Sequence, residues 1–91
     1  RLIKEKTSID LSVLVADVAA IYEPLAENQD ITIQSDISGN IPVIQGDRAR
    51  LMQCLQNLMN NAIRHTPAGG SVRISLHKQA DSLLLCVSDT G

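Results

Sequence analysis

Hydrophobic residues recur at helical spacing in the first third of the chain. Beyond Asp10 they recur at intervals of three or four positions, in places as adjacent pairs, at Leu11, Leu14, Val15, Val18, Tyr22, Leu25 and Ala26. This period predicts an amphipathic helix over residues of about 11–28 that buries its apolar stripe. Asp10 suits the N-cap because its carboxylate can accept hydrogen bonds from the first turn, and Pro24 predicts a kink. Residues 7–9 are expected to be a short extended segment.

Later patterns predict strands. Apolar and polar residues alternate over 31–37 and again over 72–78, which is the period of a strand with one buried face. Residues 83–88 instead begin with a run of Leu, Leu, Leu, Cys and Val, which favours a central strand covered on both faces. A hairpin turn is expected over 78–82, and a shorter extended piece over 41–45.

A second helical pattern starts near Leu51 and has two different faces. Asp47 is its expected N-cap, and Pro67 is expected to stop it because the residue before a proline avoids the α region. A turn at Gly69-Gly70 follows. The apolar face consists of Leu51, Met52, Leu55, Leu58, Met59, Ala62 and Ile63. The polar face consists of Gln53, Asn57, Asn60, Asn61 and Arg64.

These elements predict an α/β two-layer sandwich in which two helices pack on one face of a mixed sheet. The sheet is expected to contain the strands near 31–37, 72–78 and 83–88. A chain of 91 residues allows one small domain of marginal stability. Residues 1–6 are interpreted as the tail of a preceding helix or a linker, and residues 7–91 as the domain.

Composition narrows the function classes. The net charge is −2 with dispersed basic residues, and the chain has one Tyr and no Trp or Phe, so nothing indicates nucleic-acid binding. Cys54 and Cys86 stand in apolar surroundings and are interpreted as reduced, packed thiols rather than a disulfide. No signal peptide or membrane span is visible. A cytoplasmic location without direct membrane contact is expected, either for a free protein or for the cytoplasmic part of a membrane-bound one.

The polar face of the second helix carries the candidate chemistry. Three Asn within five residues are unusual there, because each costs about 0.5 kcal/mol relative to Ala in a helix. An Asn side chain offers a carbonyl oxygen to a hard cation and an amide donor to phosphate, and Arg64 adds a cation nearby. These short amides therefore indicate a ligand rather than a merely solvated face.

At these residues the sequence resembles the N box of sensor histidine kinases, the ATP-binding helix of the Bergerat (GHKL) nucleotide fold. The matching positions are Asn57, Asn61, Ala62, Arg64, His65, Thr66 and Pro67. Gly46-Asp47 before the helix and Gly69-Gly70 after it strengthen the resemblance, and Asp89-Thr90-Gly91 is similar to the family's first glycine box. The resemblance spans nearly the whole chain.

The resemblance implies roles for the helix residues. Asn61 would be the Mg²⁺ ligand that bridges the ATP phosphates, and Arg64 a phosphate contact. His65 stands where the family often carries Tyr beside the nucleotide, so packing against adenine or ribose is weighed equally with an ordinary surface role. Asn57 stands where ATP-hydrolysing relatives carry a Glu that activates water, and an amide cannot be a general base. Asn57 therefore favours a kinase over a related ATPase.

The resemblance also implies an adenine site and partners. Asp89 would accept a hydrogen bond from the adenine amino group, Gly91 would let the backbone approach the base, and Thr90 would assist through a water. The implied function is the ATP-binding part of a sensor histidine kinase in a two-component system. With ATP and Mg²⁺ it would supply the phosphoryl group for a His on a separate dimerisation domain, and a response regulator would be the downstream partner. The alternative is a nucleotide-incompetent module for dimerisation or protein binding.

The family's pattern continues past the first glycine box into an ATP lid, a second glycine box and a Phe-containing segment. None of these follows Gly91, so residues 7–91 are expected to be the N-terminal two thirds of a catalytic domain, inactive as an enzyme alone. The run from Leu83 to Val87 would then be left at an open sheet edge. Self-association through that edge is expected.

Overall fold

The computed structural model describes residues 7–90. The order of elements is β1 (Thr7–Ile9), α1 (Leu11–Asn28), β2 (Thr32–Ser38), β3 (Ile44–Gly46), α2 (Arg48–His65), β4 (Ser71–Gln79) and β5 (Ser82–Asp89). The interpretation of residues 1–6 and the role expected for Gly91 lie outside the described residues. Neither described helix is long and apolar enough to cross a membrane.

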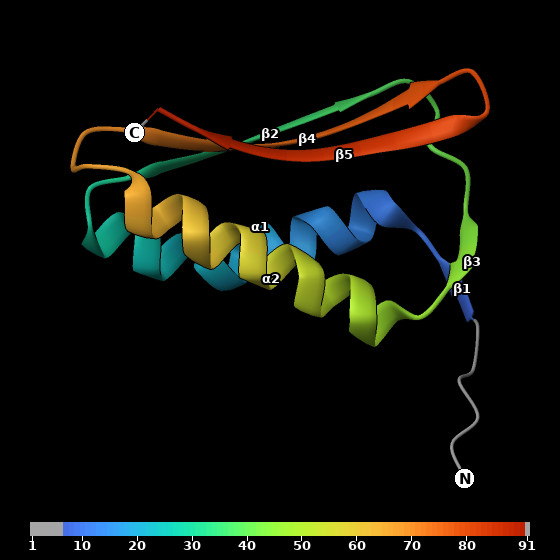
Figure 1. The fold of residues 1–91 in the computed structure, drawn as a ribbon, viewed down its shortest axis with the longest axis horizontal. Helices are drawn as coiled ribbons and strands as arrows, with labels where there is room; N and C mark the ends of the chain where they lie inside the picture. The colour runs from blue at the N-terminus through green and yellow to red at the C-terminus, as the bar shows by residue number, and fades with distance from the viewer. Residues whose placement is uncertain (1–6, 91) are drawn as a thin grey trace, which may run out of the picture.

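The main sheet forms one layer and the two helices form the other (Figure 1). Its strand order is β2-β4-β5, with β2 parallel and β5 antiparallel to β4, so the sheet is mixed as expected. Val72, Ile74 and Leu76 of β4 are fully buried on the face that the helices cover. β1 and β3 form a separate antiparallel pair at one end of the molecule. The predicted two-layer fold class is confirmed.

Helix α1 begins where the sequence predicts. The Asp10 carboxylate accepts hydrogen bonds from the backbone N–H groups of Ser12 and Val13, at 3.0 and 3.4 Å. The helix then runs through Pro24 to Asn28. The expected stripe is buried except for Leu25, which is 41% exposed, so that part of the prediction is wrong. Leu25 lies at the margin of the stripe.

Helix α2 is capped and terminated by local chemistry. The Asp47 carboxylate accepts from the Arg50 N–H at 3.2 Å. Thr66 has extended backbone angles, as a residue before a proline requires, and its hydroxyl donates to the Ala62 carbonyl at 2.7 Å. The core residues of α2 are Leu55, Met59, Ala62 and Ile63. Leu58, expected on the core face, is 43% exposed because it lies at the edge of the apolar stripe.

Two expectations about the apolar run are corrected. Among the described strands β4, not β5, is central, and β5 pairs only with β4. Leu84 and Cys86 accordingly lie exposed on the open face of the sheet, while their neighbours in β5 pack against the core. Cys54 is exposed on α2 as well. Both thiols are free, as expected, but neither is packed.

Candidate functional site

The polar face of α2 presents its amides and its cation together. Asn57, Asn61 and Arg64 are all exposed, and they are spaced four and three residues apart, so they follow one another along one side of the helix. The Arg64 guanidinium Nη2 donates to Asn61 Oδ1 at 3.2 Å. His65 is exposed beside Arg64 in the last turn, where the Arg64 charge complements the helix dipole.

The Asn oxygens and the Arg64 guanidinium on this face suit a metal cation only when an anionic ligand binds together with it. No group of three or more acidic, His or Cys side chains that could hold a metal is found among residues 7–90. The Asn61 carbonyl oxygen has a second lone pair beyond the one that Arg64 engages. Mg²⁺ commonly takes one or two protein oxygens and completes its shell with water and phosphate. Asn61 beside Arg64 therefore fits a Mg²⁺-phosphate unit better than a bare metal.

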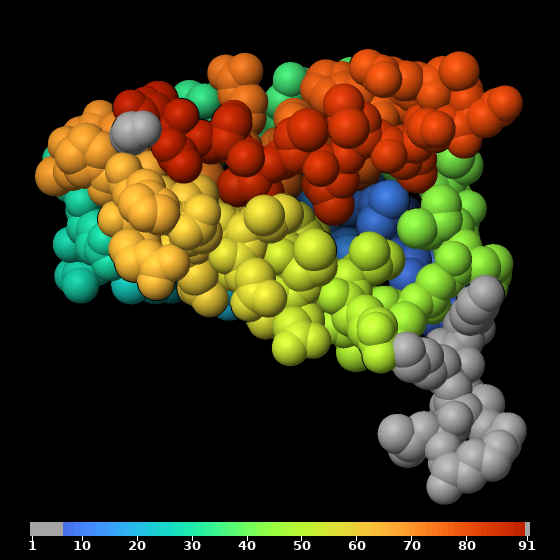
Figure 2. Space-filling model, in the orientation of Figure 1, coloured from blue at the N-terminus to red at the C-terminus, as the bar shows by residue number. Residues whose placement is uncertain are grey.

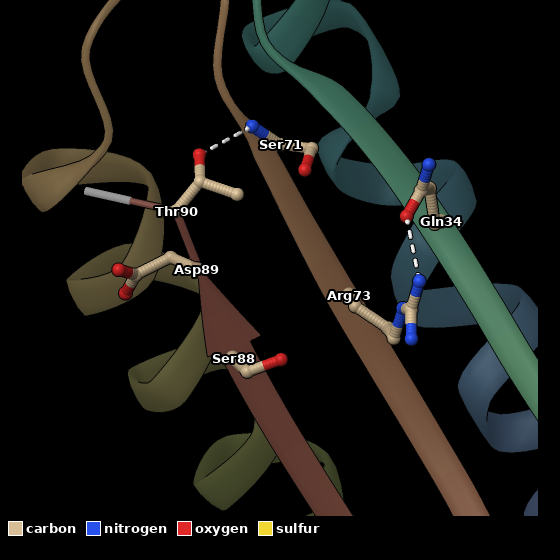
Figure 3. Close-up of a pocket in the computed structure, with 6 residues that line it drawn as sticks. All are labelled: Gln34, Ser71, Arg73, Ser88, Asp89 and Thr90. Carbon is tan, nitrogen blue, oxygen red and sulfur yellow. Dashed lines mark hydrogen bonds between the residues drawn. The ribbon is translucent and has the colours of Figure 1, made fainter.

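Asp89 ends β5 on the side of the sheet that the helices cover. It pairs in register with Val72, whose side chain is buried on that side. Strand alternation therefore sends Ser88 and Thr90 to the opposite, open face. Figure 3 shows the Asp89 carboxylate pointing away from the Ser88 hydroxyl.

Thr90 has a structural function that the sequence did not reveal. Its hydroxyl oxygen accepts a hydrogen bond from the Ser71 N–H at 3.0 Å, and its own N–H donates to the Ser71 carbonyl at 3.1 Å (Figure 3). These two bonds extend the β4–β5 pairing beyond Asp89. They fix the backbone from which the Asp89 side chain projects.

Gly70 joins the helix end to the strand end. A Cβ at this position would lie 2.6 Å from Thr66 Cγ2 and 2.7 Å from Thr90 Oγ1, closer than real Cβ contacts. Only glycine therefore fits between these two side chains. In Figure 2 the end of β5, in dark red, lies directly against the last turn of α2. The Asn-bearing helix and Asp89 thus meet at one end of the molecule.

A small depression lies on the open face of the sheet at the same end. Its lining residues are Gln34, Ser71, Arg73, Ser88, Asp89 and Thr90 (Figure 3). The Arg73 guanidinium donates to Gln34 Oε1 at 3.4 Å across the two strands. At about 140 Å³ the depression is smaller than the usual range for small-molecule sites, and no residue of α2 lines it. It is distinct from the polar face of α2.

The two-layer sandwich carries exposed Asn and Arg side chains on α2 at the end of the molecule where β5 ends. Residues 46–91 match the family described as Histidine kinase-, DNA gyrase B-, and HSP90-like ATPase, and the chain belongs to this family. Within the family the similar proteins are sensor kinases. The adaptive-response sensory kinase SasA of Rippkaea orientalis is 34% identical over 82 residues, which cover 89% of this chain and 21% of that protein.

Solved structures lead to the same branch of the family. The catalytic domain of histidine kinase ThkA superposes with a TM-score of 0.89 at 25% identity, over 96% of this chain and 59% of that one. Full-length ShkA, solved in complex with AMPPNP, gives a TM-score of 0.89 at 30% identity, over 99% of this chain and 19% of that one. The resemblance to a histidine kinase catalytic domain is confirmed. The chain spans about a fifth of the length of SasA.

Proposed function

We propose that this chain is the ATP-binding part of a sensor histidine kinase and supplies ATP for phosphoryl transfer to a His on a separate dimerisation domain. The observation that carries the proposal is the Asn61–Arg64 pair, exposed on α2 at the end of the molecule where Asp89 leaves β5. The likeness to ShkA, which was solved with the ATP analogue AMPPNP, supports it.

In this proposal residues of α2 bind the phosphates, and the end of β5 recognises the adenine base. Asn61 contributes one neutral oxygen to Mg²⁺, and Arg64 contributes a guanidinium to the phosphates. Bound Mg²⁺ neutralises phosphate charge. Asp89 accepts from the adenine amino group, and His65 packs beside the nucleotide. Thr90 holds the strand end that carries Asp89 through its hydrogen bonds with Ser71.

Asn57 decides whether bound ATP is hydrolysed or kept for phosphoryl transfer. It lies one turn before Asn61 on the same exposed face, and its amide cannot take a proton from water. ATP bound here is therefore held without rapid hydrolysis and remains available for transfer to a protein side chain. The parent protein would act in the cytoplasm with a response regulator as its partner.

Titration of the folded chain with ATP tests the proposal. We expect saturable binding of ATP that weakens when a chelator removes Mg²⁺. Binding of GTP should be weaker, because guanine has a carbonyl oxygen in place of the adenine amino group. Phosphate release should stay slow under the same conditions. A folded chain that shows no saturable ATP binding would instead favour the nucleotide-incompetent protein-binding module, and rapid phosphate release would favour an ATPase.

The edge of β5 leads to a prediction about assembly. No described strand pairs with its outer side, so its backbone N–H and C=O groups can pair with a second copy. We expect the sedimentation coefficient of residues 1–91 to rise with concentration, and Leu84→Lys to abolish the rise by placing a charge on this strand. Val43→Lys, which removes another exposed apolar side chain outside the strands, is the matched control. A monomer at every concentration would contradict edge pairing.

A further inference from the structure

Tyr22 connects the two helices at the level of the candidate site. Its side chain lies on α1 and is only 7% exposed. The phenolic hydroxyl donates a hydrogen bond to the Gln56 carbonyl oxygen at 3.1 Å. Gln56 lies in the middle of α2, directly before Asn57. A buried side chain of the first helix therefore reaches the backbone at the start of the amide-bearing turn.

The same hydroxyl also interacts with the next turn of α2. Asn60, a residue that the family motif leaves without a role, follows Gln56 by one helical turn and is near enough to the phenol to influence its pKa. Burial raises the pKa of Tyr22, and the Asn60 side chain opposes this rise in part. The phenol therefore keeps its proton at neutral pH and stays a donor. Gln56 and Asn60 stand on either side of Asn57 in the sequence.

We propose that Tyr22 is a positioning residue for the nucleotide site, holding α2 at the rotation that presents Asn57 and Asn61 to the ligand. The inference rests on the proposed function, since it concerns the same amides. Aliphatic contacts hold α2 against its neighbours by close packing, but no single contact of this kind has a preferred direction. A hydrogen bond to a backbone carbonyl is directional and fixes the rotation of that turn.

A second link between the helices provides the matched control. The Arg48 Nη2 and the Asp17 Oδ2 lie 3.0 Å apart, and both side chains are about half exposed. Arg48 is the first residue of α2, far along the helix from Asn61. Removing this ion pair loosens the α1–α2 contact without acting on the amide-bearing turn.

Tyr22→Phe removes the hydroxyl and keeps the ring. We expect the dissociation constant for Mg²⁺-ATP to rise about three- to tenfold, the range set by one lost hydrogen bond. Binding of ATP without Mg²⁺ should change less, because Asn61 acts through the metal. Asp17→Asn should bind Mg²⁺-ATP as the wild type does. Asn60→Ala removes the other polar side chain near the phenol and should weaken binding in the same direction if Tyr22→Phe does not fold.

A spectroscopic signal separates positioning from packing. Tyr22 is the only Tyr, and the chain has no Phe or Trp, so its ring resonances can be assigned without overlap from those residues. We expect these resonances to shift when Mg²⁺-ATP is added to the wild type. Unmoved resonances, together with unchanged affinity in both Tyr22→Phe and Asn60→Ala, would show that Tyr22 only fills the core. A wild type that binds no ATP would overturn the proposed function itself, and this inference with it.

Discussion

Asn61→Ala is expected to weaken the binding of Mg²⁺-ATP at least tenfold while the chain remains folded. The substitution removes the oxygen proposed as metal ligand, and interactions with charged groups contribute about 1.5–3 kcal/mol, which corresponds to roughly ten- to 150-fold in affinity. Asn61 is exposed, and Ala has the higher helix propensity, by about 0.5 kcal/mol. The free energy of unfolding should therefore stay the same or rise slightly. Titration calorimetry and urea unfolding measure the two quantities.

Gln53→Ala is the matched control for Asn61. Gln53 is an exposed amide on the same helix, two turns earlier, and its truncation should leave Mg²⁺-ATP affinity unchanged. The difference between Asn61→Ala and wild type should shrink when Mg²⁺ is chelated, because the lost oxygen acts through the metal. Equal affinity of Asn61→Ala and wild type in the presence of Mg²⁺ would remove Asn61 from the site.

Gly70→Ala is expected to damage both stability and nucleotide binding. The new Cβ would meet Thr66 and Thr90 at 2.6 and 2.7 Å, so the helix end or the strand end must move. Overpacking of this kind typically costs about 1–3 kcal/mol, and each kcal/mol lowers the Tm of a 60–100-residue domain by roughly 4–8 °C. Displacement of Thr90 also displaces Asp89, so ATP affinity should fall. Thermal unfolding and ATP titration of the same sample test this.

Gly39→Ala separates the strain of a turn from damage to the site. Gly39 has a φ of +76° with open space around it, and it follows the end of β2 that lies away from Gly70. Alanine in that conformation costs about 1–2 kcal/mol. We therefore expect a lower Tm and an unchanged affinity for ATP. Gly70→Ala with wild-type stability would show that Thr66 and Thr90 move apart freely and do not hold the site.

Local signals predicted the elements well because the chemistry that starts and stops them is local. Asp10 and Asp47 cap their helices as expected, and Thr66-Pro67 ends α2. The width of a buried stripe is different, because it depends on how much of the helix the sheet reaches. Periodicity alone placed Leu25 and Leu58 in the core, and both are exposed.

Long-range relations explain what the sequence did not reveal. The run from Leu83 to Val87 has the same composition whether it lies in the centre of a sheet or at its edge, and only pairing decides. The contact from Tyr22 to Gln56 joins residues of different helices, and a single Tyr among aliphatic residues was its only signal. Asn57 and Asn61 were found because a contiguous motif carries them.

The parallel pairing of β2 with β4 has a consequence for the order of folding. β4 and β5 are joined by a two-residue loop, whereas the β2–β4 ladder pairs residues 39 positions apart. Hairpins form within about 1–10 μs. Strands that are distant in sequence pair more slowly, because closing the longer loop between them costs more conformational entropy before any contact forms. The hairpin that carries Asp89 should therefore form early and the β2–β4 ladder late. Helix α2 lies in the segment of chain between β2 and β4. A ligand bound by both α2 and Asp89 therefore stabilises only chains in which the slow β2–β4 pairing is complete.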